Sequence, residues 1–326
     1  MKKILIFGLF LLCCKPGKKE EILPIKPVKG YKGFDARINC IAVSKDSSIL
    51  ALGLTNGKII LWDIKKGKTL KEVKHRYAVN DIEFSYDGKY MASASADQTF
   101  KIWHTKDYTL SDSALLFYGP ATSVSFSDDS KYLAVGFGDR IAIIWDITQA
   151  KIYGKLQGHT DVVTDLCFKP SSKILVTVGR DSTIFVWDIL KAKNIHKSMP
   201  HFGSINKVKF SKSGRYYATA STDSSVKVWN GEDFMFVAYF YPHFSKVWSL
   251  SFSPNEEYIL AGDGKGVVTL WSIKEKKKVS RIITHKKAVR DIAFINDSIF
   301  VTVGDDSAVR FFNLKEILKT LTKAKK

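Results

Sequence analysis

Short apolar runs separated by polar turns recur along most of this chain, and their lengths are those of β-strands. Residues 158–188 show one unit clearly: runs at 162–168, 173–178 and 183–186 are separated by turns that contain Pro, Ser, Gly and Asp. Runs of four to eight residues rich in Val, Ile, Phe and Thr between such turns are typical of strands. Three strands form a meander that cannot bury both of its faces alone, so the unit needs neighbours of its own kind.

The unit repeats seven times. Its third strand ends on an aromatic residue, with steps of 41 or 42 residues: Trp62, Trp103, Trp145, Trp187, Trp229, Trp271 and Phe312. Its first strand ends on an apolar residue: Val43, Phe84, Phe126, Phe168, Phe210, Phe252 and Phe294. Nine residues earlier stands a histidine or a phenylalanine: Phe34, His75, Phe117, His159, His201, His243 and His285. Six residues before the aromatic position, five repeats have an acidic turn residue: Asp97, Asp139, Asp181, Asp223 and Asp306. This period, with several strands in each repeat, predicts the blades of a β-propeller.

Gly158-His159 and Trp187-Asp188 resemble the two ends of the signature of the WD-repeat (G-beta-type) family, and repeats 2, 4, 5 and 7 match most of it. The resemblance spans roughly residues 34–313. It implies an all-β fold, a seven-bladed β-propeller of four-stranded antiparallel blades around a central channel. It also implies a buried hydrogen-bonded tetrad of His, Ser or Thr, Asp and Trp within each complete blade. The matching residues are His75, Ser93, Asp97 and Trp103; His159, Thr177, Asp181 and Trp187; His201, Thr219, Asp223 and Trp229; and His285, Thr302 and Asp306.

Repeats 1, 3 and 6 depart from this pattern. Repeat 1 has Phe34, Leu52 and Asn56 at the His, Ser/Thr and Asp positions. Repeat 3 has Phe117 and Val135 at the His and Ser/Thr positions, and repeat 6 has Ala261 and Lys265 at the Ser/Thr and Asp positions. The last blade needs a fourth strand, which either residues 28–32 or the C-terminal tail could supply. The tail carries apolar residues at helical spacing, which favours the N-terminal segment as the closing strand.

The first 14 residues are not expected to belong to the propeller. Lys2 and Lys3 precede a nine-residue apolar stretch, residues 4–12, which has the length of a signal-peptide core and is too short to span a bilayer. It runs into Cys13 and Cys14, which resembles a bacterial lipoprotein signal. Leu11 and the small Cys13 precede Cys14 as that pattern requires, so Cys14 is the predicted lipidation site and Cys13 the alternative. An uncleaved anchor or an unusual cytosolic N-terminus is the competing interpretation.

These features divide the chain into four segments. Residues 1–14 form the lipoprotein-like signal, 15–27 a polar tether, 28–314 the propeller and 315–326 a basic C-terminal tail. The remaining cysteines, Cys40 and Cys167, fall in blades on opposite sides of the ring, beyond the ~7 Å Cα separation that a disulfide allows. We therefore predict two unpaired structural cysteines.

The formal net charge of the 326 residues is +19, and lysines gather after the tryptophan positions. Such a charge favours anionic partners, although it also serves solubility. The predicted export signal argues against nucleic acid as a partner. No catalytic residue, metal site or cofactor is predicted, because the His and Asp positions recur in four repeats whereas an active site needs one constellation. The chain also lacks the common metal, phosphate-loop and nucleophile motifs.

One position distinguishes repeats 6 and 7. Four residues before the end of the first strand stand Asn39, Asn80, Thr122, Thr164, Asn206, Trp248 and Arg290. The small polar residues suggest a position near solvent at the channel mouth, where Trp248 either packs between blades or acts as an exposed anchor for a partner. The second interpretation predicts a cationic and aromatic partner-binding patch on blades 6 and 7: Phe244, Trp248, Lys265, Lys286 and Arg290.

The sequence thus predicts a membrane-tethered, non-enzymatic scaffold for protein–protein interaction, lipid-anchored in the bacterial cell envelope at the periplasmic or outer-membrane face. Protein partners, acidic ones among them, and the membrane are the expected contacts. An adhesin that binds anionic lipids or acidic glycans through its lysines is the alternative. A propeller enzyme would require clustered acidic residues of perturbed pKa in the channel.

Overall fold

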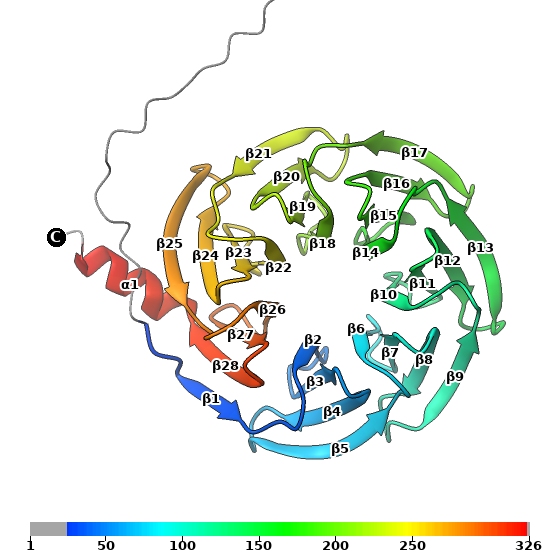
Figure 1. Ribbon diagram of the computed structural model, residues 1–326, viewed down its shortest axis with the longest axis horizontal. Helices are drawn as coiled ribbons and strands as arrows, with labels where there is room; N and C mark the ends of the chain where they lie inside the picture. Colours follow the sequence, from blue (N-terminus) through cyan, green and yellow to red (C-terminus); the bar gives the residue numbers. More distant parts are fainter. Residues whose placement is uncertain (1–24, 325–326) are drawn as a thin grey trace, which may run out of the picture.

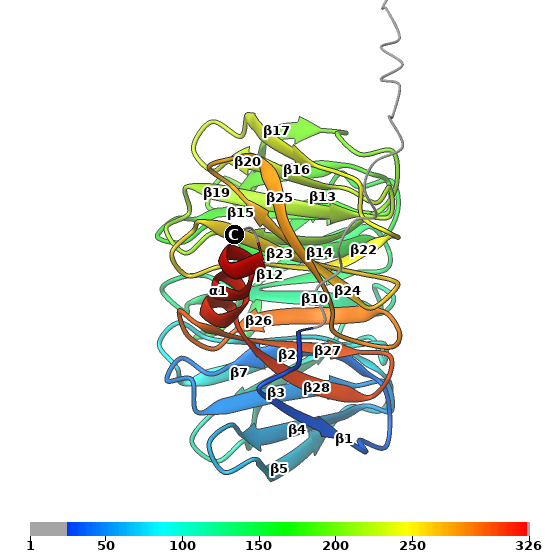
Figure 2. The ribbon, with the colours of Figure 1, turned by 90° about the vertical axis from the view of Figure 1, so that its left-hand side faces the viewer.

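The computed structural model describes residues 25–324, which form seven four-stranded antiparallel sheets arranged as the blades of a closed ring (Figure 1). The predicted all-β, seven-bladed propeller is therefore confirmed. The side view shows the sheets stacked around the ring axis, with the single helix of the described part at the rim (Figure 2). The predicted signal segment, its lipidation sites Cys13 and Cys14, and most of the tether lie outside the described residues.

Each blade contains four strands, which are described here in order from the channel outward. The innermost strands are β2 (Ile38–Val43), β6 (Val79–Phe84), β10 (Ala121–Phe126), β14 (Val163–Phe168), β18 (Ile205–Phe210), β22 (Val247–Phe252) and β26 (Val289–Phe294). The second strands are β3 (Ile49–Leu54), β7 (Tyr90–Ser95), β11 (Tyr132–Phe137), β15 (Ile174–Gly179), β19 (Tyr216–Ser221), β23 (Tyr258–Asp263) and β27 (Ile299–Gly304). The third strands are β4 (Lys58–Asp63), β8 (Thr99–His104), β12 (Ile141–Asp146), β16 (Ile184–Asp188), β20 (Val226–Asn230), β24 (Val267–Ser272) and β28 (Ala308–Asn313). The outer strands are β5 (Lys68–Lys74), β9 (Leu110–Leu115), β13 (Lys151–Gln157), β17 (Lys193–Ser198), β21 (Phe236–Phe240), β25 (Lys277–Ile283) and β1 (Lys29–Lys32).

The N-terminal strand closes the ring, as the helical spacing of the tail favours. β1 pairs antiparallel with β28, with Lys29 opposite Phe311 and Lys32 opposite Ala308. The tail forms α1 (Leu314–Ala324) instead of a strand, and its Leu314 and Ile317 are buried in the core of blades 6 and 7. Joining the two ends of the chain in one blade leaves the outer strands as the exposed sheet edges, which limits edge-to-edge association.

The hydrophobic core lies between neighbouring blades. Phe168 and Trp187 of blade 4, for example, share one buried cluster with Ala134 and Ile144 of blade 3. Cys40 and Cys167 are buried free thiols, as predicted. This arrangement gives each blade two apolar faces, which explains why an isolated repeat cannot be stable.

Phe117 does not occupy the place of the missing histidine in blade 3. Its side chain is 74% exposed, and its backbone has a left-handed φ of 51°. The indole Nε1 of Trp145 instead donates at 3.0 Å to Asp112 on β9, the outer strand of blade 2, and Phe100 of blade 2 packs edge-on against the same indole. A polar partner from the neighbouring blade thus replaces the tetrad, and the phenylalanine lies at the surface.

Candidate partner-binding face

The four predicted tetrad sets lie within their blades as hydrogen-bonded networks. In blade 4, His159 Nε2 lies 2.9 Å from Thr177 Oγ1, which also accepts from Trp187 Nε1 at 2.9 Å, and His159 Nδ1 lies 3.0 Å from Asp181. Blades 2 and 5 repeat these contacts. Blade 7 keeps the histidine contacts to Thr302 and Asp306, while Phe312 replaces the indole.

Electrostatics hold these networks in one protonation state. Burial alone would raise the pKa of Asp181, but hydrogen bonds from His159 and from backbone N–H groups lower it to about 2. Burial lowers the pKa of His75 and His201 despite their aspartate partners. At neutral pH these groups are therefore a carboxylate and a neutral imidazole, which suits a structural link.

The loops that carry the His and Asp positions lie on one face of the ring, here called the upper face. A cavity of about 920 Å³ opens there at the channel mouth. Its wall includes Asn80, Thr122, Thr164, Asn206 and Trp248, from the position that distinguishes repeats 6 and 7. In each innermost strand this position falls at a β-bulge, which turns the side chain toward the next blade. Asn206, for instance, donates to the carbonyl of Val247 at 2.7 Å.

Trp248 and Arg290 break this series of small polar links and contact each other instead. The Arg290 guanidinium carbon lies 4.9 Å from the centre of the Trp248 ring. Two nitrogens of the same guanidinium donate to the Asp305 carboxylate, each at 2.8 Å. Trp248 thus packs against the next blade through a cation–π contact and also lines the cavity, so the two interpretations of this residue are not exclusive.

The other three residues of the predicted patch lie on the same face but do not join this contact. Phe244 packs under the guanidinium of Arg281, whose carbon lies 4.1 Å from the ring centre. Lys265 and Lys286 are exposed on the turn before β24 and the loop before β26. The patch is therefore one tight pair surrounded by separate cationic and aromatic side chains.

Exposed aromatic residues on the upper face were missed from the sequence. Phe202 is 99% exposed, and Tyr77 and Phe117 are more than half exposed on the equivalent loops of blades 2 and 3. Together with Phe244 they lie on the upper-face loops of four blades. The signal was available, since three of the four stand one or two residues after the histidine position. Exposed aromatic groups on one face are typical of interaction surfaces.

The channel itself contains charged residues that sequence reasoning also missed. They stand three residues before the end of the innermost strand, at the positions Cys40, Asp81, Ser123, Asp165, Lys207, Ser249 and Asp291. Lys207 Nζ lies 3.4 Å from Asp81 and 3.5 Å from Asp165. Comparing this position across the repeats would have revealed the pattern, because it shows charged residues inside otherwise apolar strands.

The lower end of the channel forms a cavity of about 360 Å³ lined by Glu83, Lys209 and Asp291 among apolar residues. Burial raises the pKa of Glu83 to about 7 and also raises that of Asp291. Clustered acidic residues of perturbed pKa are therefore present, as an enzyme would require. However, the carboxylates accept from backbone N–H groups of neighbouring blades, Glu83 from Phe126 and Asp291 from Ile41, so they already link the ring together.

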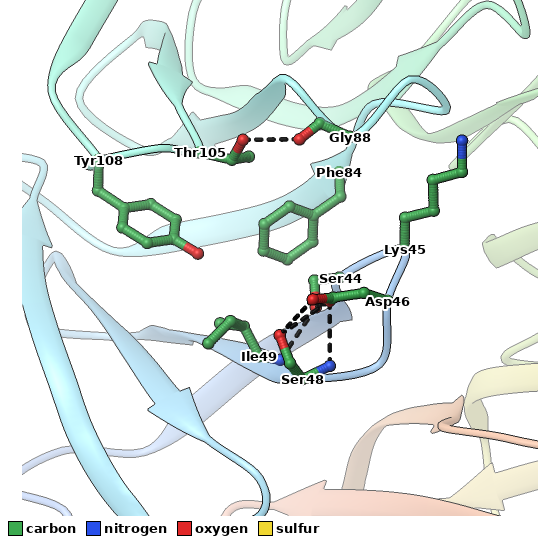
Figure 3. A pocket seen from close by; sticks show the side chains of 9 residues that line it. All are labelled: Ser44, Lys45, Asp46, Ser48, Ile49, Phe84, Gly88, Thr105 and Tyr108. Atoms are coloured by element: carbon green, nitrogen blue, oxygen red, sulfur yellow. Dashed lines mark hydrogen bonds between the residues drawn. The ribbon is translucent and has the colours of Figure 1, made fainter.

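Another cavity, of about 680 Å³, lies on the lower face between blades 1 and 2 (Figure 3). The rings of Phe84 and Tyr108 flank it, and Lys45 extends away from them. The carboxylate of Asp46 accepts from the hydroxyls of Ser44 and Ser48 at 2.6–2.8 Å, and these bonds lower its pKa. Its polar groups are thus occupied by the turn itself.

Neither a metal-binding cluster nor a membrane-spanning helix occurs among residues 25–324. No group of three or more His, Cys, Asp or Glu side chains in this range is arranged to hold a metal ion. No helix in the same range is long and apolar enough to cross a bilayer.

Comparison with known sequences defines the class of protein. The family described as "WD40: WD domain, G-beta repeat" matches seven segments: residues 25–63, 67–104, 115–146, 150–188, 193–230, 235–272 and 276–313. The chain therefore belongs to the WD-repeat family, whose propellers are generally non-enzymatic scaffolds that bind protein partners.

Individual relatives match only short stretches. The chain is 43% identical over 65 residues to "WD repeat and SOCS box-containing protein 1" of Homo sapiens, which is 19% of this chain and 15% of that protein. It is 35% identical over 74 residues to "Small ribosomal subunit protein RACK1" of Glycine max, 23% of this chain and 22% of that protein. A "Coronin-like protein" of Saccharomyces cerevisiae matches at 28% over 88 residues, 27% of this chain and 14% of that protein. These matches reflect shared repeats within longer, different proteins.

Proposed function

We propose that this protein is a non-enzymatic scaffold that binds a protein partner on its upper face and is tethered to the membrane of a bacterial cell envelope by a lipid at Cys14, with Cys13 as the alternative site. The observation that carries the binding part is the set of exposed aromatic side chains on the loops of the upper face, above all the fully exposed Phe202. Large aromatic groups are the residues that most often dominate binding energy at protein interfaces.

The partner-binding pair is expected at blades 6 and 7. Trp248 lines the upper cavity and presents a ring already ordered by Arg290, which is itself held by Asp305. A rigid aromatic group loses little conformational entropy on binding, so more of its contact energy appears as affinity. An acidic segment of the partner could also approach Lys265 and Lys286, which are exposed nearby.

The double substitution Trp248→Ala/Arg290→Ala should reduce partner capture at least about tenfold, because removing a central interface pair typically costs more than 1.4 kcal/mol. Capture is measured by in-cell crosslinking and pull-down of the tethered protein. The matched control is Tyr216→Ala/Arg215→Ala, a cation–π pair of similar separation at the lower end of blade 5. Equal capture by the test variant and the wild type, with both folded, would contradict the proposed location.

A photo-crosslinking residue locates the interface independently. Placed at Phe202 it should yield discrete adducts with a partner, whereas placement at Leu110, an exposed apolar residue on the outer strand β9, should not. Both side chains are apolar and exposed to solvent, so the comparison separates a partner bound on the upper face from one bound at the rim. Adducts from Leu110 alone would move the interface to the rim.

The lipid tether is tested by metabolic labelling with a fatty-acid analogue in bacterial cells. Label should be lost in Cys14→Ser and kept in Cys13→Ser, because Cys14 has both the leucine three residues before it and a small preceding residue. Loss in Cys13→Ser alone would reassign the site. Label that persists in the double variant would contradict the tether.

An adhesin that binds anionic lipids or glycans is the second candidate, favoured by the net charge of +19. The loops of the upper face carry nearly balanced numbers of basic and acidic residues, whereas lysines predominate on the outer strands. An adhesin would therefore bind anionic vesicles in a salt-sensitive way that survives Trp248→Ala. A scaffold that uses the aromatic upper face would instead lose binding in that variant.

A further inference from the structure

Blade 6 collects buried polar atoms that lack a hydrogen-bond partner. His243 is 5% exposed, and neither of its ring nitrogens has a partner among the described residues. Trp271 Nε1 and Thr269 Oγ1 are likewise buried and unpaired. Unpaired buried groups of this kind are rare in folded proteins, and each costs about 1–3 kcal/mol. Their concentration in a single blade therefore calls for a specific physical cause.

The cause is the loss of one hydroxyl. In blades 2, 4 and 5, the oxygen of Ser93, Thr177 or Thr219 lies within 2.8–3.2 Å of both the histidine Nε2 and the tryptophan Nε1. Ala261 takes this position in blade 6, so the corresponding nitrogens of His243 and Trp271 lose the atom that joins them. The two rings nevertheless stay together, with centroids 5.5 Å apart.

A residue two positions earlier partly replaces the missing tetrad aspartate. Asp263 is fully buried, and one of its carboxylate oxygens accepts from the N–H groups of Lys265 and Val267 at 2.9 and 3.1 Å. In blade 4 the turn carboxylate of Asp181 accepts in the same way from Thr183 N–H. Asp263 thus secures the turn, but no hydrogen bond joins it to His243, so the nitrogens of His243 and Trp271 remain unpaired.

We propose that blade 6 holds an internal water molecule where the other blades have the Ser or Thr hydroxyl. The water accepts from the indole N–H of Trp271 and donates to His243 Nε2. Its second hydrogen bonds Thr269 Oγ1, which lies on the same face of β24 as Trp271 and opposite Ala261 in the strand ladder. Buried waters typically make about three such bonds to groups that would otherwise be unsatisfied.

The chemistry of each group fits this assignment. The indole nitrogen can only donate, so the atom that meets it must be an acceptor. Burial lowers the pKa of His243 to about 3, which leaves a neutral ring with one acceptor nitrogen at physiological pH. Alanine lacks two heavy atoms relative to threonine, which is space comparable to that of one water.

The location connects this site to the proposed binding face without depending on it. His243 begins the loop that carries Phe244, and Trp248 follows on β22. An exchangeable water in place of a fixed hydroxyl restrains the upper loop of blade 6 less than the tetrads of blades 2, 4 and 5 restrain theirs. The hydration site itself stands whether or not a partner binds above it.

The first test observes the water in the wild-type full chain. Water–amide NMR spectroscopy should show a contact between a long-lived water and the Trp271 indole proton. The Trp187 indole, which donates to Thr177, should show none. A crystal structure at about 2 Å or better should place the same water within hydrogen-bond distance of His243 and Trp271. Absence of both signals would overturn the proposal.

The second test replaces the water by a hydroxyl. Ala261→Thr should raise the midpoint of thermal unfolding by at least about 2 °C and abolish the water contact. The new hydroxyl would form hydrogen bonds with His243 Nε2 and Trp271 Nε1 in place of the water. Val135→Thr is the matched control in blade 3, where Phe117 lies outside and Trp145 already bonds Asp112, so its midpoint should fall. An equal fall in both variants would overturn the proposal, and if Ala261→Thr does not fold, the wild-type NMR and crystallographic results decide the question.

Discussion

Lys207→Met is expected to lower the free energy of unfolding by about 3–5 kcal/mol at pH 7, because it leaves buried carboxylates without their cation. The Lys207 side chain is 12% exposed, and it lies between Asp81 and Asp165, which are exposed by 5% and 2%. Burial opposes the charge of Lys207, but the two aspartates raise its pKa well above the usual range. Reciprocally, Lys207 helps to hold the pKa of Asp81 below its ordinary value despite burial.

The loss should be measured by chemical unfolding followed through tryptophan fluorescence. Without the lysine the pKa of Asp81 should rise, so a falling pH neutralises it more readily and the deficit relative to wild type should shrink toward pH 5. Lys212→Met, an exposed lysine in the same blade, should change stability by no more than about 0.5 kcal/mol. A loss below about 1 kcal/mol in Lys207→Met would mean that the channel charges are hydrated and independent.

His243 should contribute a loss of stability in mild acid, whereas Glu83, whose pKa burial raises to about 7, should act in the opposite direction. Burial lowers the pKa of His243 to about 3, whereas an unfolded histidine titrates near 6.5. The unfolded chain therefore binds the proton first, so the stability from the neutral ring is complete above about pH 6.5 and is lost as the pH falls toward 3. The expected loss from this residue is about 1.4 kcal/mol per pH unit, or about 3 kcal/mol between pH 6.5 and 4.

Unfolding curves at several pH values between 4 and 7 check this expectation. His243→Phe should flatten the slope by about 1.4 kcal/mol per pH unit, since phenylalanine carries no proton to gain. Ile282→Val is the control, because this buried residue of the same blade carries no titratable group, so its substitution should leave the slope unchanged. The slope that remains would combine His75, His201 and His285, whose pKa values burial also lowers, with Glu83 and Asp291, whose raised pKa values act in the opposite direction.

The contrast between blades 4 and 6 shows how far the tetrads could be predicted. His159, Thr177, Asp181 and Trp187 stand at fixed spacings, and their contacts lie within one blade, so the sequence register alone was enough to group them. The same register correctly indicated that Ala261 and Lys265 interrupt the pattern. It could not indicate that Asp263 would secure the turn from two positions earlier, because that depends on the local path of the backbone.

The candidate binding face was predicted only in part. Trp248 and Arg290 were predicted because they occupy equivalent positions in adjacent repeats. Their cation–π contact and the hydrogen bonds from Arg290 to Asp305 could not be predicted, because they depend on how blade 6 packs against blade 7. The register placed Phe117 at the histidine position of repeat 3, but it could not predict that the side chain is exposed. Trp145 bonds instead to Asp112, a partner in the neighbouring blade that no repeat position marks.

By itself, the sequence determined the number of blades, the three complete tetrads and a fourth that lacks the tryptophan. These properties are local: each repeat is a unit of about 40 residues whose apolar period and turn residues act on near neighbours. Only the tertiary structure decided what the channel contains and which groups meet between blades. Lys207 contacts Asp81 across 126 residues of sequence, and Asp291 accepts from Ile41 across 250, since closing the ring brings the ends of the chain together.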